Sequence, residues 1–180
     1  MKYFKRPFLL IGLSVVVLGL AQVPVGAEES DSITDAQMVK IRSQCTDLQS
    51  TLTRVHVNDA LLRVNRGQLY ELLSTKLMAR LNSRIALNRL DSTKLIAATT
   101  IYEKHLKEFR ANYQAYEEAL SGTIKTNCVN QPVLFYDQLQ EVRVKRAEVF
   151  SSTEALGNSI QAYKDAFDEF KKPYYKEAAS

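Results

Sequence analysis

The feature that most constrains the fold is a seam of apolar side chains in the last third of the chain. Between Phe135 and Tyr174, twelve positions recur at alternating steps of four and three residues, and only Arg146 and Thr153 among them are neither apolar nor aromatic. This spacing places side chains along one face of an α-helix and is typical of coiled-coil packing. The seam therefore predicts one long helix over residues 132–172, which needs partner helices to cover it.

Two prolines are expected to bound this helix. Pro132 suits the first helical turn, because the N–H that proline lacks is not needed there. Pro173 is expected to end the helix, since a proline inside a helix removes a hydrogen bond. Residues 173–180 are therefore predicted to form a tail.

Two further long helices are predicted upstream. Residues 34–37, Thr-Asp-Ala-Gln, form a capping-box pattern, and no proline follows before Leu90, which predicts a helix over 34–90. Its apolar positions step by four and three at first and drift to steps of four from Leu69 onward. A turn at residues 91–93 precedes a second helix over 93–121, whose apolar stripe is Ala98, Tyr102, Leu106, Phe109, Tyr113, Tyr116 and Leu120.

These elements predict an all-α fold, a single antiparallel three-helix bundle over residues 34–172 with long coiled-coil-like helices and one disulfide. Beyond residue 27 the chain has only three glycines and two prolines, one of them Gly122, which is expected to end the second helix. A many-stranded β fold would need turn residues every 8–12 residues or so, which excludes that class.

The first 27 residues have the order of a secretory signal peptide. A basic start, Met1–Arg6, precedes the apolar run Phe8–Leu20, and small residues at Val25 and Ala27 match a cleavage site. The apolar run is shorter than the roughly 20 residues that span a bilayer. We expect export to the periplasm, the cell surface or the medium, with membrane anchoring as the alternative if the signal stays uncleaved. An acidic leader, 28–33, would follow.

Export favours a disulfide between the two cysteines, Cys45 and Cys128. A hairpin folded at Asp91 brings the linker after Gly122 back to the level of Cys45, which supports the same pairing. The alternative is a metal site, but the chain has only two histidines and neither is at ligand spacing.

The polar residues that interrupt the apolar seams are expected at one level along the bundle when the chain folds back at Asp91. Arg146 of the third helix falls near Asp59 and Arg66 of the first, and Tyr116 of the second lies at a similar level. One hypothesis is a buried polar layer that fixes the helix register, with the carboxylate held between arginines. The alternative is that the long arginine stems carry their charges out to solvent.

No catalytic or cofactor-binding pattern is apparent. His56 and His105 are single histidines on helices, and the chain has neither a phosphate-binding glycine loop nor an HExxH motif. We expect no enzyme activity, no metal and no cofactor. Without residues 1–27 the chain has 21 bases against 20 acids, which gives no support to nucleic-acid binding. Residues 34–90 carry nine bases and four acids, so their arginines could contact an anionic membrane surface.

The sequence resembles small exported helical proteins of unknown function from bacteria with reduced genomes, over most of residues 38–172. The resemblance rests on Arg42-Ser43-Gln44-Cys45, on Cys128 followed by Pro132, and on Val142-Arg143 with Arg146. It implies export and a helical fold, and it carries no known activity or catalytic residues. The long helices also look like those of periplasmic holdase chaperones, although the seam and the disulfide favour a closed bundle.

The sequence therefore predicts an exported, non-enzymatic interaction or structural protein of the cell envelope. A protein partner in the envelope is expected, with self-association as a further option. A periplasmic chaperone-like clamp is the alternative function, followed by an enzyme or a small-ligand binder in a groove between helices.

Overall fold

The computed structural model describes residues 33–177. The predicted signal peptide, 1–27, and the leader up to residue 32 lie outside the described residues. The described range is all-helical and contains no β-strand. Its elements are α1 Asp35–Ser43, α2 Cys45–Leu72, the π-helical segment η1 Leu73–Met78, α3 Ala79–Leu87, α4 Thr93–Lys125 and α5 Pro132–Glu177.

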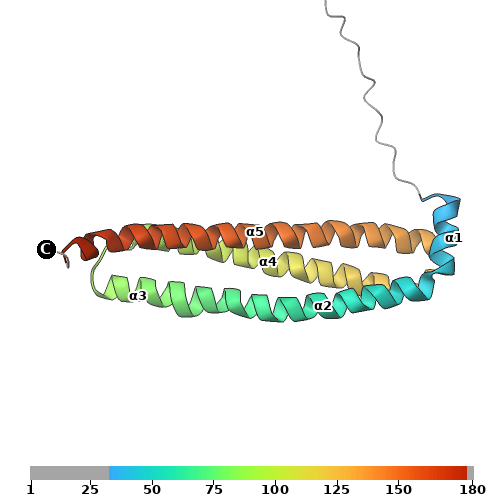
Figure 1. The fold of residues 1–180 in the computed structure, drawn as a ribbon, viewed down its shortest axis with the longest axis horizontal. Coiled ribbons are helices and arrows are strands. Elements are labelled where there is room, and N and C mark those ends of the chain that lie inside the picture. The colour runs from blue at the N-terminus through green and yellow to red at the C-terminus, as the bar shows by residue number, and fades with distance from the viewer. Residues whose placement is uncertain (1–32, 178–180) are drawn as a thin grey trace, which may run out of the picture. The chain divides into compact units, whose positions relative to one another are not determined.

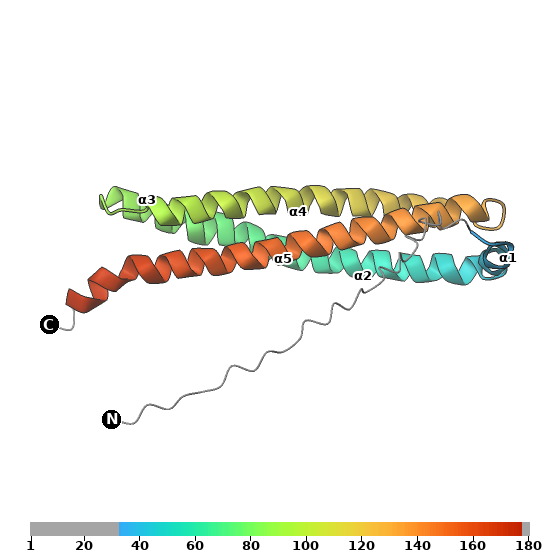
Figure 2. The same cartoon turned by 90° about the horizontal axis from the view of Figure 1, so that it is seen from above.

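The long helices form a bundle in which α4 contacts both α2 and α5 (Figures 1 and 2). Lys94 of α4 bonds Glu169 of α5 at one end, and Thr126, directly after α4, bonds Gln138 of α5 at the other. Bonds between α4 and the preceding helical segments include Asn82 to Thr99 at 2.8 Å, and Arg110 Nε to Glu71 Oε1 at 2.7 Å.

The apolar stripe of α4 is buried as its spacing predicts. All seven predicted positions, from Ala98 to Leu120, have relative exposures of 8% or less. Two core clusters line the helix, one around Tyr102 and Leu106 and one around Tyr116 and Leu120. The α4 helix is therefore the centre of the core.

The first predicted helix, 34–90, begins as expected but is not continuous. The capping box is present, since Thr34 Oγ1 accepts a hydrogen bond from the backbone N–H of Gln37. The helix then breaks at Gln44, whose backbone leaves the α region (φ −109°, ψ 14°), and α1 turns away from α2 (Figure 1). The break brings Ile41 against the cluster of Cys45, Cys128 and Phe135, so tertiary packing sets its position.

A second departure is the π-helical segment η1. A stripe at steps of four rotates by about 40° per step on a regular α-helix and soon leaves the core. The wider turn of η1 corrects this drift and buries Tyr70, Ser74 and Met78. Leu69 and Leu77, which the predicted stripe included, are about half exposed.

The predicted ends of the second and third helices are also wrong. α4 continues past Gly122 to Lys125, because Thr123 is fully buried and the side-chain amide of Gln49 donates to the carbonyl oxygens of Ile124 and Thr126. α5 continues through Pro173 to Glu177, so the tail prediction over 173–177 is corrected.

The extension of α5 has a local explanation. The ring of Phe170 lies 5.3 Å from that of Tyr174, and this contact bridges the proline. Because only four helical residues follow Pro173, few backbone hydrogen bonds depend on it.

The predicted disulfide is confirmed. Cys45 and Cys128 are bonded, with their Cα atoms 5.6 Å apart. The bridge joins the start of α2 to the linker between α4 and α5. Among the described residues, none of the helices combines the length and apolar character needed to cross a membrane.

Candidate functional site

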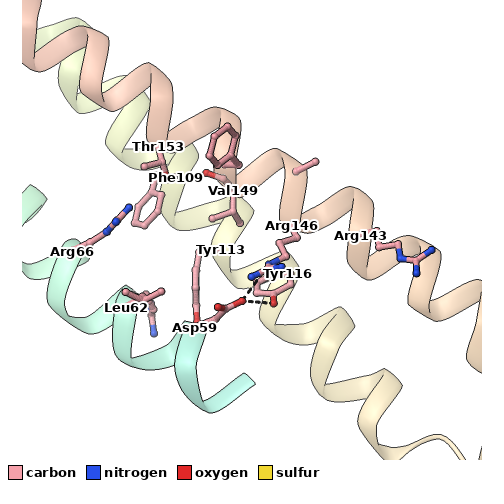
Figure 3. A pocket seen from close by; sticks show the side chains of 13 residues that line it. Asp59, Leu62, Arg66, Phe109, Tyr113, Tyr116, Arg143, Arg146, Val149 and Thr153 are labelled. Carbon is pink, nitrogen blue, oxygen red and sulfur yellow. Dashed lines mark hydrogen bonds and ion pairs between the residues drawn. The ribbon is translucent and has the colours of Figure 1, made fainter. Parts of the chain in front are cut away.

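A groove of about 660 Å³ opens at the middle of the bundle, and we call it the central groove. It exists because no Cα of α2 comes within 8 Å of a Cα of α5 in the described chain, so their side chains form facing walls above α4. Figure 3 shows these side chains at close range. The lining residues are Asp59, Leu62, Arg63, Arg66, Phe109, Tyr113, Tyr116, Arg143, Arg146, Ala147, Val149, Phe150 and Thr153.

Three aromatic side chains of α4 form the floor. The ring centroids of Phe109 and Tyr113 lie 6.4 Å apart, and those of Tyr113 and Tyr116 lie 6.1 Å apart. Burial raises the pKa of Tyr113 to about 12, and the nearby Glu117 carboxylate adds to the shift. Burial and the hydrogen bond to Asp59 also raise the pKa of Tyr116, so both hydroxyls keep their protons to a higher pH than a free tyrosine does.

Three of the four residues predicted to form a polar layer come together at one end of the groove. The Tyr116 hydroxyl donates a 2.6 Å hydrogen bond to Asp59 Oδ2, and Arg146 Nε lies 3.4 Å from the same oxygen (Figure 3). Asp59 is largely covered, with 16% of its side chain exposed, whereas Arg146 is 61% exposed. The carboxylate is therefore held between a buried hydroxyl and a guanidinium that reaches solvent.

The fourth residue, Arg66, lies in the same groove without joining this cluster. Its side chain is exposed and extends from α2 toward Phe109 (Figure 3). Because Arg66 and Arg146 are both exposed, neither belongs to a buried layer, which corrects that part of the hypothesis. The physical reason is the gap between α2 and α5, which gives long arginine stems a route to water.

Two further arginines of the groove were not assigned to the predicted polar layer. The Arg63 guanidinium lies 4.9 Å from the centroid of the Tyr113 ring, and Arg143 donates a 3.1 Å hydrogen bond to the Gln140 side-chain oxygen. The sequence signal that could have identified them is a pair of arginines three residues apart on each wall of the groove. The pairs are 63 and 66 on α2, and 143 and 146 on α5. Residues at this spacing share a helix face.

The two histidines lie outside the central groove. His56 contacts the Glu117 carboxylate, and His105 Nδ1 lies 2.6 Å from the Ser159 hydroxyl. Among the described residues, no group of three His, Cys, Asp or Glu side chains is placed to hold a metal ion. The chemistry that the groove does offer is a surplus of positive charge above an apolar floor.

No protein-family model, curated protein or solved structure matches this chain. Its function therefore has to be argued from the groove and the surfaces around it.

Proposed function

We propose that this protein is an exported, non-enzymatic interaction protein of the cell envelope, and that it binds through the central groove. The observation that carries the proposal is the groove itself. It combines aromatic and aliphatic lining with four guanidinium groups and one carboxylate. Clefts that are mostly apolar and carry a few placed polar groups are typical of binding sites.

The bundle that carries this groove is proposed to be an antiparallel three-helix bundle with coiled-coil-like packing. Contacts between α4 and α5 support it, since Asn112 on α4 donates to the Ser152 hydroxyl at 2.8 Å midway between the end pairs. The buried seam of α5, with Phe135, Leu156 and Tyr163, supports it as well. A bundle held in this way keeps the two walls of the groove at a fixed separation.

The proposed export is supported by the signal-like order of residues 1–27 and by the disulfide. Disulfides persist mainly in oxidising compartments. With export, the site of action is the periplasm, the cell surface or the medium, and an uncleaved signal would hold the protein at the membrane.

A photo-cross-linking amino acid placed at Phe150 tests the proposed function. Phe150 lies on the groove wall and is 70% exposed, so the replacement should not disturb the core. Cells producing this variant are fractionated and irradiated, with the same amino acid at the exposed Lys107 on α4 as a control. We expect the protein in the envelope fraction. The cross-linker at position 150 should form adducts there that the cross-linker at position 107 does not form. Retention in the cytoplasm, or equal labelling from both positions, would contradict the proposal.

Self-association is a second candidate role, favoured by an apolar stripe on the other side of α2. Val57, Leu61, Val64 and Leu72 share one helix face, and each is 50% to 60% exposed. Burying such a stripe against a second copy would remove apolar surface from water. Sedimentation of the purified protein should show a dimer that Leu61→Glu converts to monomer. A protein that is monomeric before this change has no such role.

A further inference from the structure

We infer that the central groove binds a single-chain amphipathic anion, with one carboxylate head and an unbranched apolar body. The inference rests on the proposed function and names the ligand chemistry of the same groove. Three properties of the lining support it: its size, its exposed apolar walls, and its uncompensated guanidinium groups.

The size and walls suit an apolar body. A volume of about 660 Å³ lies within the roughly 300–1,000 Å³ of small-molecule sites. Leu62 on one wall is 53% exposed and Phe150 on the other is 70% exposed, while Val149 between them is half-buried. An apolar chain lying between these side chains and the aromatic floor would remove their surface from water, which is the main source of affinity for such a ligand.

The charges select an anion. Four arginines line the groove, and Asp59 is the only acid among the lining residues. That carboxylate already contacts the Tyr116 hydroxyl and the Arg146 guanidinium, so it neutralises at most one arginine. A neutral or cationic head would leave the remaining positive charge unpaired.

The free donor suits one carboxylate. Arg63 is held over the Tyr113 ring, whereas no described side chain accepts a hydrogen bond from Arg66. Its guanidinium extends over the groove from α2 (Figure 3). A planar guanidinium matches a planar carboxylate through two parallel hydrogen bonds. A phosphate head can carry close to two negative charges, and pairing both of them would need a second unpaired donor beside Arg66.

Isothermal titration of the purified, disulfide-bonded protein tests the inference with three probes of equal chain length. Dodecanoate should bind one to one below its micelle concentration. Dodecanol, which lacks the charge, should bind at least tenfold more weakly, and dodecyl phosphate should not exceed dodecanoate. Removing two methylene groups from the acid should weaken binding several-fold, because less apolar surface is buried.

Two variants locate the site. Arg66→Gln should weaken dodecanoate binding about five- to tenfold, whereas Arg84→Gln, on the exposed face of α3 outside the groove, should leave it unchanged. Ala147→Trp fills the groove from the exposed wall of α5 and should abolish binding. Both groove variants should melt at the temperature of the unmodified protein, since neither residue is buried.

Equal binding of dodecanol and dodecanoate, tighter binding of dodecyl phosphate, or binding that survives Ala147→Trp would each overturn the inference. These outcomes are separable from those of the cross-linking experiment. Groove-specific adducts from position 150 without dodecanoate binding would leave the proposed function standing and remove this ligand class. If neither groove-specific adducts nor dodecanoate binding is found, the proposed function and this ligand class are both contradicted.

Discussion

The helices α2 and α4 have similar lengths, yet the bundle uses them differently. Of the 33 residues of α4, nine are buried, whereas of the 28 residues of α2 only Cys45 and Tyr70 are. The difference comes from phase, because the apolar residues of α4 share one face and those of α2 are spread around the helix. One helix is thus a core element, and the other leaves apolar side chains free on two faces.

The attachment of α2 combines a few apolar contacts, from Leu48, Leu52, Val55 and Tyr70, with polar and covalent ones. The disulfide fixes its first residue, Gln49 caps the end of α4, and Asp59 accepts a hydrogen bond from Tyr116. Glu71 contacts Arg110 near its other end. A helix held at separate points can stand away from α5, which is what keeps the central groove open.

Removing the disulfide should have the largest effect on stability, and it should loosen α2 most. The pair Cys45→Ser and Cys128→Ser opens a loop of 83 residues, for which chain entropy predicts a loss of about 4–5 kcal/mol in the free energy of unfolding. Urea unfolding measures the loss. Hydrogen exchange should accelerate more in α2 than in α5, because α2 has fewer apolar contacts. Equal acceleration in both helices would mean that α2 is not the weakly held one.

The next largest effect should come from truncating one leucine on each helix, because the loss in the free energy of unfolding should differ between α4 and α2. Leu106→Ala on α4 removes a side chain that is 1% exposed and should cost about 3 kcal/mol. Leu62→Ala on α2 removes one that is 53% exposed and should cost less than about 1 kcal/mol. Urea unfolding of both variants provides the measurement, and similar costs would show that α2 is packed more tightly than its exposure indicates.

The cluster at the end of the groove should respond unequally to loss of its two donors. Tyr116→Phe removes a hydrogen bond to a largely covered carboxylate and should cost about 1.5 kcal/mol. Arg146→Gln removes an ion pair whose cation is 61% exposed and should cost less than about 1 kcal/mol. Denaturant unfolding compares the two, and the reverse order would show that α5 holds Asp59 more strongly than α4 does.

The smallest expected effect is on stability at alkaline pH, and it comes from the tyrosines of the groove floor. It is absent near neutral pH. An unfolded tyrosine titrates near pH 10, whereas burial raises the pKa of Tyr113 to about 12. Both states are protonated below pH 10, so stability is unaffected there. Between pH 10 and 12 the unfolded chain loses its proton first, and stability falls.

Unfolding free energies at pH 8 and pH 11 measure this fall. It should be smaller in Tyr113→Phe than in the unmodified protein, and unchanged in Tyr174→Phe, whose side chain is 44% exposed. An identical fall in all three proteins would show that Tyr113 ionises as freely in the bundle as in the unfolded chain.

The sequence predicted what depends on regular spacing. The stripe of α4, the continuity of α5 past Thr153 and the pairing of Cys45 with Cys128 follow from period, phase and chain length. The heights of Asp59, Tyr116 and Arg146 followed from one assumed fold point at Asp91.

What the sequence did not predict depends on contacts made after folding. The break at Gln44 serves the packing of Ile41, and the continuation of α4 past Gly122 depends on the distant Gln49 side chain. A groove between helices was only the last alternative for a similar reason. Spacing shows which face of α5 is apolar, but it does not show that α2 stands too far away to cover it.

The π-helical segment has a consequence for how this chain tolerates changes in length. Residues 73–78 hold one residue more than a regular helix needs over the same rise. A deletion of one residue there would restore an ordinary α-helix and keep Ile85 pointing into the core. The same deletion near Val64 would rotate the rest of the helix by about 100°. Among related genes, single-codon gains and losses in this helix should therefore gather at residues 73–78.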